Sequence, residues 1–140
     1  MTMAMDDIPD PPKIDPRAVS ETQNASGNYV VLKVGNDRYA FYEHLKSKSI
    51  RVHTADQIRR GQVLAQLGYT GQSTGPHLHF HVADSIAPLN AEGVPYIFEE
   101  IKTLGTFFSA EQFGRGEPWN RLRANKHRQF PAPFSVIEFP

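Results

Sequence analysis

The sequence contains no cysteine, so it forms no disulfide bonds and offers no thiolate to a metal ion. Any metal site must therefore use histidine and carboxylate ligands. The formal net charge at pH 7 is zero with the histidines neutral, and the longest basic run is Arg59-Arg60. These features give no reason to expect a nucleic acid or an anionic membrane as a partner.

Long hydrophobic stretches are also missing. No segment approaches the roughly 18 consecutive apolar residues of a membrane span. The first ten residues have neither the basic nor the apolar region of a signal peptide. Apolar residues nevertheless make up 39% of the 140 residues, which is enough to bury a core. The length predicts a single folded domain.

One segment carries clear chemistry. From Gly75 to Val82 the chain reads Gly-Pro-His-Leu-His-Phe-His-Val. Alternation with a period of two predicts a half-buried β-strand, on which His77, His79 and His81 share one face and their apolar neighbours face a core. Same-face neighbours lie about 6.6 Å apart and the outer two rings about 13 Å apart, from a rise of ~3.3 Å per residue. Two rings can therefore share one ion and all three cannot, so a further ligand must come from elsewhere.

The rest of the chain predicts short strands and turns. Residues 1–26 contain four prolines and are expected to form an irregular arm. A hairpin is expected over residues 29–44, with its turn at Gly35-Asn36-Asp37. Further short strands are expected at 49–52, at 62–67 and at 134–139.

Beyond the histidine strand the pattern is less regular. Residues 88–95 are expected to form a loop, 96–101 a short ordered segment, and 105–130 a polar stretch with one helical turn near Ala110. The whole chain predicts an all-β fold, an antiparallel β-sandwich or small barrel of short strands and hairpins with an irregular N-terminal arm and a C-terminal tail. The expected organisation is an arm at 1–26, a core at 27–104 and an extension at 105–140 that ends in an edge strand.

Three segments resemble the lysostaphin-type, or LytM-like, zinc metallopeptidase domain. Residues 27–31 and 39–45 are similar to its hairpin, which opens on Gly-Asn and closes on Tyr-x-His-Leu. Residues 58–68 resemble its hairpin around Gly-Gln, and residues 70–80 read Thr-Gly-Gln-Ser-Thr-Gly-Pro-His-Leu-His-Phe, nearly word for word its signature. The likeness is dense over residues 27–83 and corresponds to the C-terminal two-thirds of such a domain.

This resemblance implies an antiparallel β-fold with a groove on one sheet face and one zinc ion held by two histidines and an aspartate. It also implies cleavage of bacterial peptidoglycan peptides by a domain that is typically secreted, periplasmic or envelope-associated. By position, His79 matches a zinc ligand, and His77 and His44 match the histidines that orient water and stabilise the transition state. The residues expected to line the substrate groove are Tyr42, Ser73, Thr74 and Gly75.

The sequence departs from this family on its N-terminal side. The other two zinc ligands of the family lie in a His-x-x-x-Asp motif, and this chain has no histidine before His44. One explanation is a truncated domain, which would be weakly active or inactive alone and would self-associate through an unpaired strand edge. A second is a degenerate, non-catalytic module that binds cell-wall peptides. A third is a zinc site rebuilt from His44, His77 and His79.

The remaining histidines give weaker predictions. His81 shares the face of the two histidines before it, but it is expected to be exposed and out of reach of their ion. His53 and His127 are expected to be ordinary surface residues. Cupins also place His-x-His on a strand, yet they need a glutamate and a histidine further along, and only His127 follows here.

Overall fold

The computed structural model describes residues 2–13, 15, 22–87 and 90–140 of the chain. Its internal contacts divide the chain into two compact units, Met1–Val94 and Pro95–Pro140, called the first and the second unit below. Each unit is built around one antiparallel sheet. The first unit contains every residue of the predicted site.

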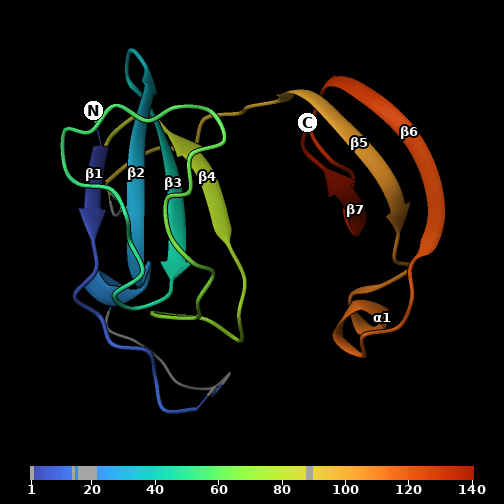
Figure 1. Cartoon of the computed structure of the whole chain (residues 1–140), viewed down its shortest axis with the longest axis horizontal. Coiled ribbons are helices and arrows are strands. Elements are labelled where there is room, and N and C mark those ends of the chain that lie inside the picture. The colour runs from blue at the N-terminus through green and yellow to red at the C-terminus, as the bar shows by residue number, and fades with distance from the viewer. Residues whose placement is uncertain (1, 14, 16–21, 88–89) are drawn as a thin grey trace. The chain divides into compact units, whose positions relative to one another are not determined.

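The first unit holds a four-stranded sheet in the order β1-β2-β3-β4 (Figure 1). Its strands are β1 (Thr2–Met5), β2 (Asn28–Gly35), β3 (Arg38–Leu45) and β4 (His79–Ala83). β2 and β3 form the predicted hairpin, and Gly35 pairs with Arg38 across a two-residue turn. Asp37 in this turn has a φ of 49°, the left-handed conformation that tight hairpin turns require. β4 completes the sheet at the edge beside β3.

Alternation along the strands gives this sheet two different faces. On one face, a buried apolar cluster is formed by Val30, Leu45 and Val52. On the other face, a second cluster is formed by Val31, Phe41 and Ala83. Phe41 lies opposite His81 in the antiparallel register, and opposite residues project to the same face. The second face is therefore the one that carries the histidines of β4.

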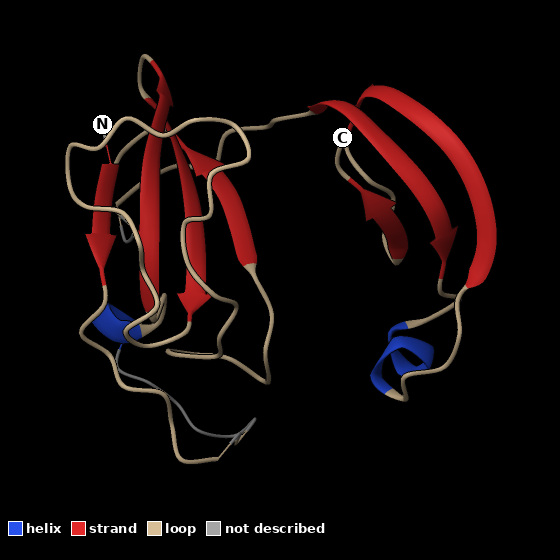
Figure 2. Cartoon of the chain, viewed as in Figure 1, coloured by secondary structure: helices blue, strands red, loops and turns tan. Residues whose placement is uncertain are grey.

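The second unit holds a three-stranded sheet in the order β6-β5-β7 (Figure 2). Its elements are β5 (Phe98–Thr106), α1 (Ala110–Gly114), β6 (Asn120–Gln129) and β7 (Ser135–Glu138). The side chain of Ser109 caps the start of α1 by accepting a hydrogen bond from the Gln112 backbone N–H. Ile101 on β5 is buried, whereas Phe108 and Phe113 are exposed.

The all-β prediction is confirmed. In the described residues, helix is limited to α1 and one 3₁₀ turn at Thr22–Asn24, and both sheets are antiparallel without closing into a barrel. The expectation of an irregular arm over 1–26 is wrong at its start, because Thr2–Met5 pairs with β2 as β1. That segment precedes the first proline, Pro9, so the backbone restriction imposed by proline does not reach it.

The strands predicted at 49–52 and 62–67 are wrong. Both segments are loops joined by scattered hydrogen bonds, such as Arg51 N–H to the Leu64 carbonyl at 2.8 Å. Val52 belongs to the first core cluster, and Ile50, Leu64 and Ala65 pack against it, so burial without strand pairing explains much of their pattern. β4 begins at His79, two residues later than the sequence predicts.

In the second unit, the predicted edge strand and helical turn are confirmed as β7 and α1. β5 contains the ordered segment expected near residue 98 and continues across residue 104, where the sequence suggests a boundary. β6 was not expected, because its side chains are almost all exposed and show no apolar alternation. The described residues include no helix with the length and apolar character that a membrane crossing needs.

Candidate metal and catalytic site

The candidate site lies on the face of β3 and β4 that carries the second core cluster. Glu43 of β3 lies directly opposite His79 of β4, and His81 follows two residues along. The Glu43 carboxylate and the two rings therefore share one surface. His77 lies just before β4, with its ring centroid 4.7 Å from that of His44. Segments far apart in sequence thus bring five titratable side chains together.

The backbone at His44 turns its ring onto this face. Its φ angle is 61°, in the left-handed region that few non-glycine residues adopt. Regular alternation would point His44 away from the side of its neighbour Glu43. With the observed backbone, the His44 ring centroid lies 5.8 Å from that of His79 as well as near His77.

A backbone carbonyl fixes the His44 ring. Nδ1 of His44 is 2.8 Å from the carbonyl oxygen of Thr70. A carbonyl can only accept, so Nδ1 carries the proton and Nε2 keeps its lone pair. The Thr70 hydroxyl donates to the Leu45 carbonyl at 2.8 Å and accepts from the Asn28 N–H at 2.9 Å. A fully buried threonine therefore holds both the strand end and the ring.

Two glycines let this network form. Gly27 and Gly71 have φ angles of 63° and 76°, and their backbones approach each other closely. A methyl group on Gly71 would lie 2.7 Å from the Cα of Gly27, and one on Gly27 would lie 2.6 Å from Oγ1 of Thr70. The Gly-Asn and Thr-Gly pairs noted in the sequence therefore position the carbonyl that orients His44.

The glycine-rich loop holds His77 in the same manner. Nδ1 of His77 is 2.8 Å from the Gly75 carbonyl, so its Nε2 is also left with a lone pair. Ser73 Oγ donates to the same carbonyl at 2.7 Å and lies 3.2 Å from His77 Nδ1. The structure thus brings Ser73, Gly75 and His77 together, while Thr74 is exposed.

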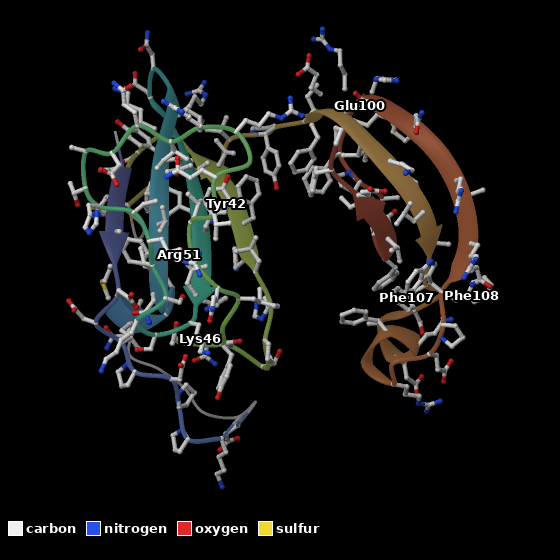
Figure 3. The ribbon with its side chains drawn as sticks, viewed as in Figure 1. Tyr42, Lys46, Arg51, Glu100, Phe107 and Phe108 are labelled. Atoms are coloured by element: carbon white, nitrogen blue, oxygen red, sulfur yellow. The ribbon has the colours of Figure 1, made fainter. Side chains whose placement is uncertain are left out.

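Tyr42 lies on the opposite face of the sheet from the histidine rings. It faces Phe80 in the register of β3 and β4, with ring centroids 5.0 Å apart (Figure 3). Together with Leu32 and Ile58 it lines a pocket of about 360 Å³. Burial raises the pKa of its phenol. The structure therefore does not bring Tyr42 into contact with the other predicted site residues.

One group of side chains has the geometry of a metal site. Glu43, His79 and His81 each offer a ligand atom, and all three atoms lie within 4.8 Å of one another. In the described part of the chain, the set of His44, His77 and His79 does not form such a group. One carboxylate with two imidazoles is a donor combination of catalytic zinc sites, so the residues present fit zinc.

The expectation that His81 is exposed and apart from the site is wrong. Its ring stacks on Phe41 with 4.5 Å between centroids and 8° between planes. Its Nδ1 is buried, without a hydrogen-bond partner among the described residues, and lies 4.0 Å from Oε2 of Glu43. Sequence reasoning missed Glu43 as well. The signal that could have found Glu43 is its position next to His44, since the strand that carries both residues pairs with the histidine strand.

Burial affects the titration of two of these rings. It lowers the pKa of His44, and the hydrogen bond to Thr70 partly opposes this effect. Burial likewise lowers the pKa of His81, and the nearby Glu43 carboxylate partly opposes it. Both rings are therefore biased toward the neutral form, which can accept a proton or bind a metal.

Comparison with protein families places residues 17–91 in peptidase family M23. That match covers more than half of the chain. The chain belongs to peptidase family M23. The likeness carried by the glycine-rich loop and the histidine strand is therefore confirmed for this M23 chain.

The relatives of this M23 chain include "Peptidoglycan DD-endopeptidase ShyA" of Vibrio cholerae, 41% identical over 66 residues, which are 47% of this chain and 15% of that protein. "Peptidoglycan DD-endopeptidase ShyB" of the same organism is 39% identical over 66 residues, with the same two coverages. "Glycyl-glycine endopeptidase ALE-1" of Staphylococcus capitis is 28% identical over 121 residues, 83% of this chain and 33% of that protein. The chain thus corresponds to only a minor part of each relative's length. No solved structure matches it.

Proposed function

We propose that this M23 chain is a zinc-dependent endopeptidase domain that acts on the peptides of peptidoglycan. The observation that supports this most directly is the pair of oriented rings at His44 and His77. Each has Nδ1 bound to a backbone carbonyl at 2.8 Å, and their centroids are 4.7 Å apart. Each ring therefore keeps the lone pair of its Nε2, and the His44 ring centroid lies 5.8 Å from that of His79, the residue proposed to bind the metal.

The chemistry assigned to these residues follows from their protonation. A zinc ion, when bound, supplies a Lewis acid and lowers the pKa of bound water toward 7. Nε2 of His77 or His44 can take a proton from the attacking water, since Nδ1 of each ring already carries its own. A ring that has gained a proton can then donate a hydrogen bond to the negative charge developing on the peptide oxygen.

The substrate class is proposed from the relatives. Two of them are named as a peptidoglycan DD-endopeptidase and a glycyl-glycine endopeptidase. Ser73, Thr74 and Gly75 form the loop next to His77 and are proposed to contact the substrate backbone. Tyr42 is left out of this proposed contact set, because it lies on the opposite face of the sheet from the histidine rings. Because peptidoglycan is an envelope polymer, the envelope is the proposed place of action.

The test is digestion of purified peptidoglycan by the zinc-loaded chain, with released muropeptides identified by mass spectrometry. The substrates are D,D-cross-linked stems and glycine-bridged stems. We expect cleavage of one of them, and a loss of about 10²–10⁴-fold in rate for His77→Ala, the usual contribution of a general base. His53→Ala is the control, since its side chain is 90% exposed. No cleavage of either substrate, or equal rates in the two variants, would contradict the proposal.

A binding module is the second candidate, supported by the lack of any histidine before His44, where the family has its His-x-x-x-Asp motif. In that case the same face would hold wall peptides without cutting them. Binding to insoluble peptidoglycan would then be unchanged by EDTA and by His77→Ala. An enzyme would instead lose its activity in EDTA.

Self-association through a strand edge also stays a prediction. β1 and β4 are the edge strands of the first sheet. Residues 92–94 cover part of β4, with Val94 N–H bound to the Val82 carbonyl at 2.8 Å. β1 is therefore the edge proposed to pair with a second copy. Sedimentation of the chain over a range of concentrations tests this, and a concentration-independent monomer would contradict it.

A further inference from the structure

We propose that Glu43, His79 and His81 form a zinc site of their own, with one carboxylate and two imidazoles as ligands. This set shares His79 with the family's zinc site but draws its other two ligands from inside the sheet. It therefore needs no His-x-x-x-Asp motif. The inference concerns metal binding and stands whether or not the chain cleaves peptides.

The register of the sheet brings the three ligands together. Glu43 and His79 are directly opposite across β3 and β4, and His81 is the next residue of β4 on the same face. The three ligand atoms lie within 4.8 Å of one another. Two atoms bound tetrahedrally to one zinc ion at about 2.1 Å lie roughly 3.4 Å apart. The side chains therefore need to close by about 1 Å, which rotation about their χ angles supplies.

One buried polar atom of this group lacks the hydrogen-bond partner that burial normally demands. Glu43 is 5% exposed, and Oε2 of its carboxylate lies 4.0 Å from Nδ1 of His81. That distance is too long for a hydrogen bond. Nδ1 of His81 is itself buried and has no hydrogen-bond partner in the described part of the chain. A buried carboxylate and a buried ring nitrogen that face each other across such a gap are both satisfied by a cation placed between them.

The neighbouring side chains keep these ligands in place. Phe41, which is fully buried, stacks on the His81 ring at 4.5 Å and fixes its plane. The rings of His79 and His81 meet edge to face, 5.4 Å apart between centroids. All three ligands project from paired strands of the sheet, and strands position ligands more precisely than loops do. The rings of His44 and His77 are not part of this group, and each is oriented by a hydrogen bond from Nδ1 to a backbone carbonyl.

The donor atoms select the kind of metal. Magnesium and calcium prefer ligand sets made only of oxygen, and two imidazoles therefore disfavour them. Imidazole with carboxylate suits first-row transition metals, zinc among them, and the lack of cysteine excludes thiolate-bound alternatives. Three protein ligands leave the fourth tetrahedral position for water, the arrangement typical of a catalytic zinc site.

The first test is zinc titration of the metal-free, 140-residue chain by isothermal calorimetry. We expect one zinc ion per chain. Glu43→Gln, His79→Ala and His81→Phe should each weaken binding on the order of 100-fold or more, because even outer-shell partners of a metal ligand contribute about 10–100-fold. His81→Phe keeps an aromatic ring on Phe41 and so retains the packing.

The chain offers a matched control pair. Glu100 of β5 lies opposite His127 of β6 in antiparallel register, as Glu43 does with His79, but both are exposed. Glu100→Gln and His127→Phe should leave zinc affinity unchanged. No zinc bound by the parent, or parent-like affinity in both Glu43→Gln and His81→Phe, would overturn the proposal.

X-ray absorption of the zinc-loaded parent gives a second measurement that does not depend on any variant folding. We expect a first shell with two imidazoles and oxygen ligands. Three imidazoles would overturn the proposal and favour the set of His44, His77 and His79. A chain that binds zinc through the proposed ligands yet cleaves no peptidoglycan would refute the proposed function alone, and an active chain with other ligands would refute the zinc site alone.

Discussion

The candidate site has two regions, and they hold their histidine rings by different contacts. At the loop end, His44 and His77 each give Nδ1 to a backbone carbonyl at 2.8 Å. On the strands, His81 is held by stacking on Phe41, and its buried Nδ1 has no hydrogen-bond partner among the described residues. A hydrogen bond from Nδ1 to a carbonyl fixes the tautomer of a ring and leaves Nε2 for proton transfer or metal binding, whereas stacking fixes the plane of a ring without fixing its tautomer.

The largest loss of stability should come from Gly71→Ala, which disturbs the region that anchors the His44 ring. We expect a loss of roughly 2–5 kcal/mol in the free energy of unfolding, because the left-handed backbone costs about 1–2 kcal/mol and overpacking adds about 1–3 kcal/mol. The added methyl group would meet the backbone of Gly27. Denaturant unfolding followed by circular dichroism measures the change.

Gly61→Ala is the matched control for that substitution. Gly61 has a φ of 78°, nearly that of Gly71, but no heavy atom of the described residues lies within 4 Å of the position where its Cβ would be. It should therefore lose only the backbone contribution of about 1–2 kcal/mol. Equal losses in the two variants would show that the close approach of Gly71 and Gly27 does not matter.

The second effect concerns Glu43 on the strands, and it depends on whether zinc is bound. Zinc at 100 times its dissociation constant should raise the free energy of unfolding by about 2.7 kcal/mol. Glu43→Gln should lose most of this gain. Without metal, Glu43→Gln should be neutral or slightly stabilising, because it removes a buried charge that lies 4.0 Å from its ion-pair partner, Nδ1 of His81. Thermal melts with and without zinc measure both, and destabilisation of the metal-free variant would argue for a structural role of the carboxylate.

The third effect separates the two regions directly. Thr70→Val removes the hydroxyl that donates to Leu45 and accepts from Asn28, and should cost about 1–3 kcal/mol because buried polar groups lose their partners. Peptidase activity should fall with the displacement of the His44 anchor, while zinc affinity stays within a factor of a few. Thr70→Ser keeps the hydroxyl and is the control. A parallel loss of zinc binding would show that the two regions are not independent.

The smallest effect should follow from Ser73→Ala. His77 keeps its hydrogen bond to the Gly75 carbonyl without the serine, so stability should change by less than about 1 kcal/mol. Steady-state rates should fall by no more than about tenfold. Thr74→Ala, at an exposed neighbouring position, serves for comparison. A loss of rate as large as that of His77→Ala would indicate that Ser73 does more than orient the His77 ring.

The sequence predicted the hairpin of β2 and β3 and the histidine strand because both have apolar alternation and clear turn residues. It predicted strands at 49–52 and 62–67 for a similar reason, and there it failed. Those apolar side chains cover one face of the sheet from loops, and composition does not distinguish burial on a sheet from membership of one. β6 has the opposite character, since it is paired over ten residues but almost wholly exposed.

The site was predictable to the extent that it is local. His77 and His79 follow from one continuous motif, and His44 from the resemblance of the hairpin. Glu43 and its contact with His81 depend on the register between two strands that are more than thirty residues apart in sequence. A period-two pattern shows which residues share a face within a strand, but it does not show which residue lies opposite them.

The left-handed backbone at His44 affects how its substitution should be interpreted. Asparagine, aspartate and histidine are the non-glycine residues that tolerate this conformation best. His44→Ala would therefore remove the imidazole and also place a less tolerant residue at a φ of 61°. A fall in activity would then mix lost chemistry with backbone adjustment. His44→Asn keeps a residue type suited to this conformation, so any loss that it causes can be attributed mainly to the ring.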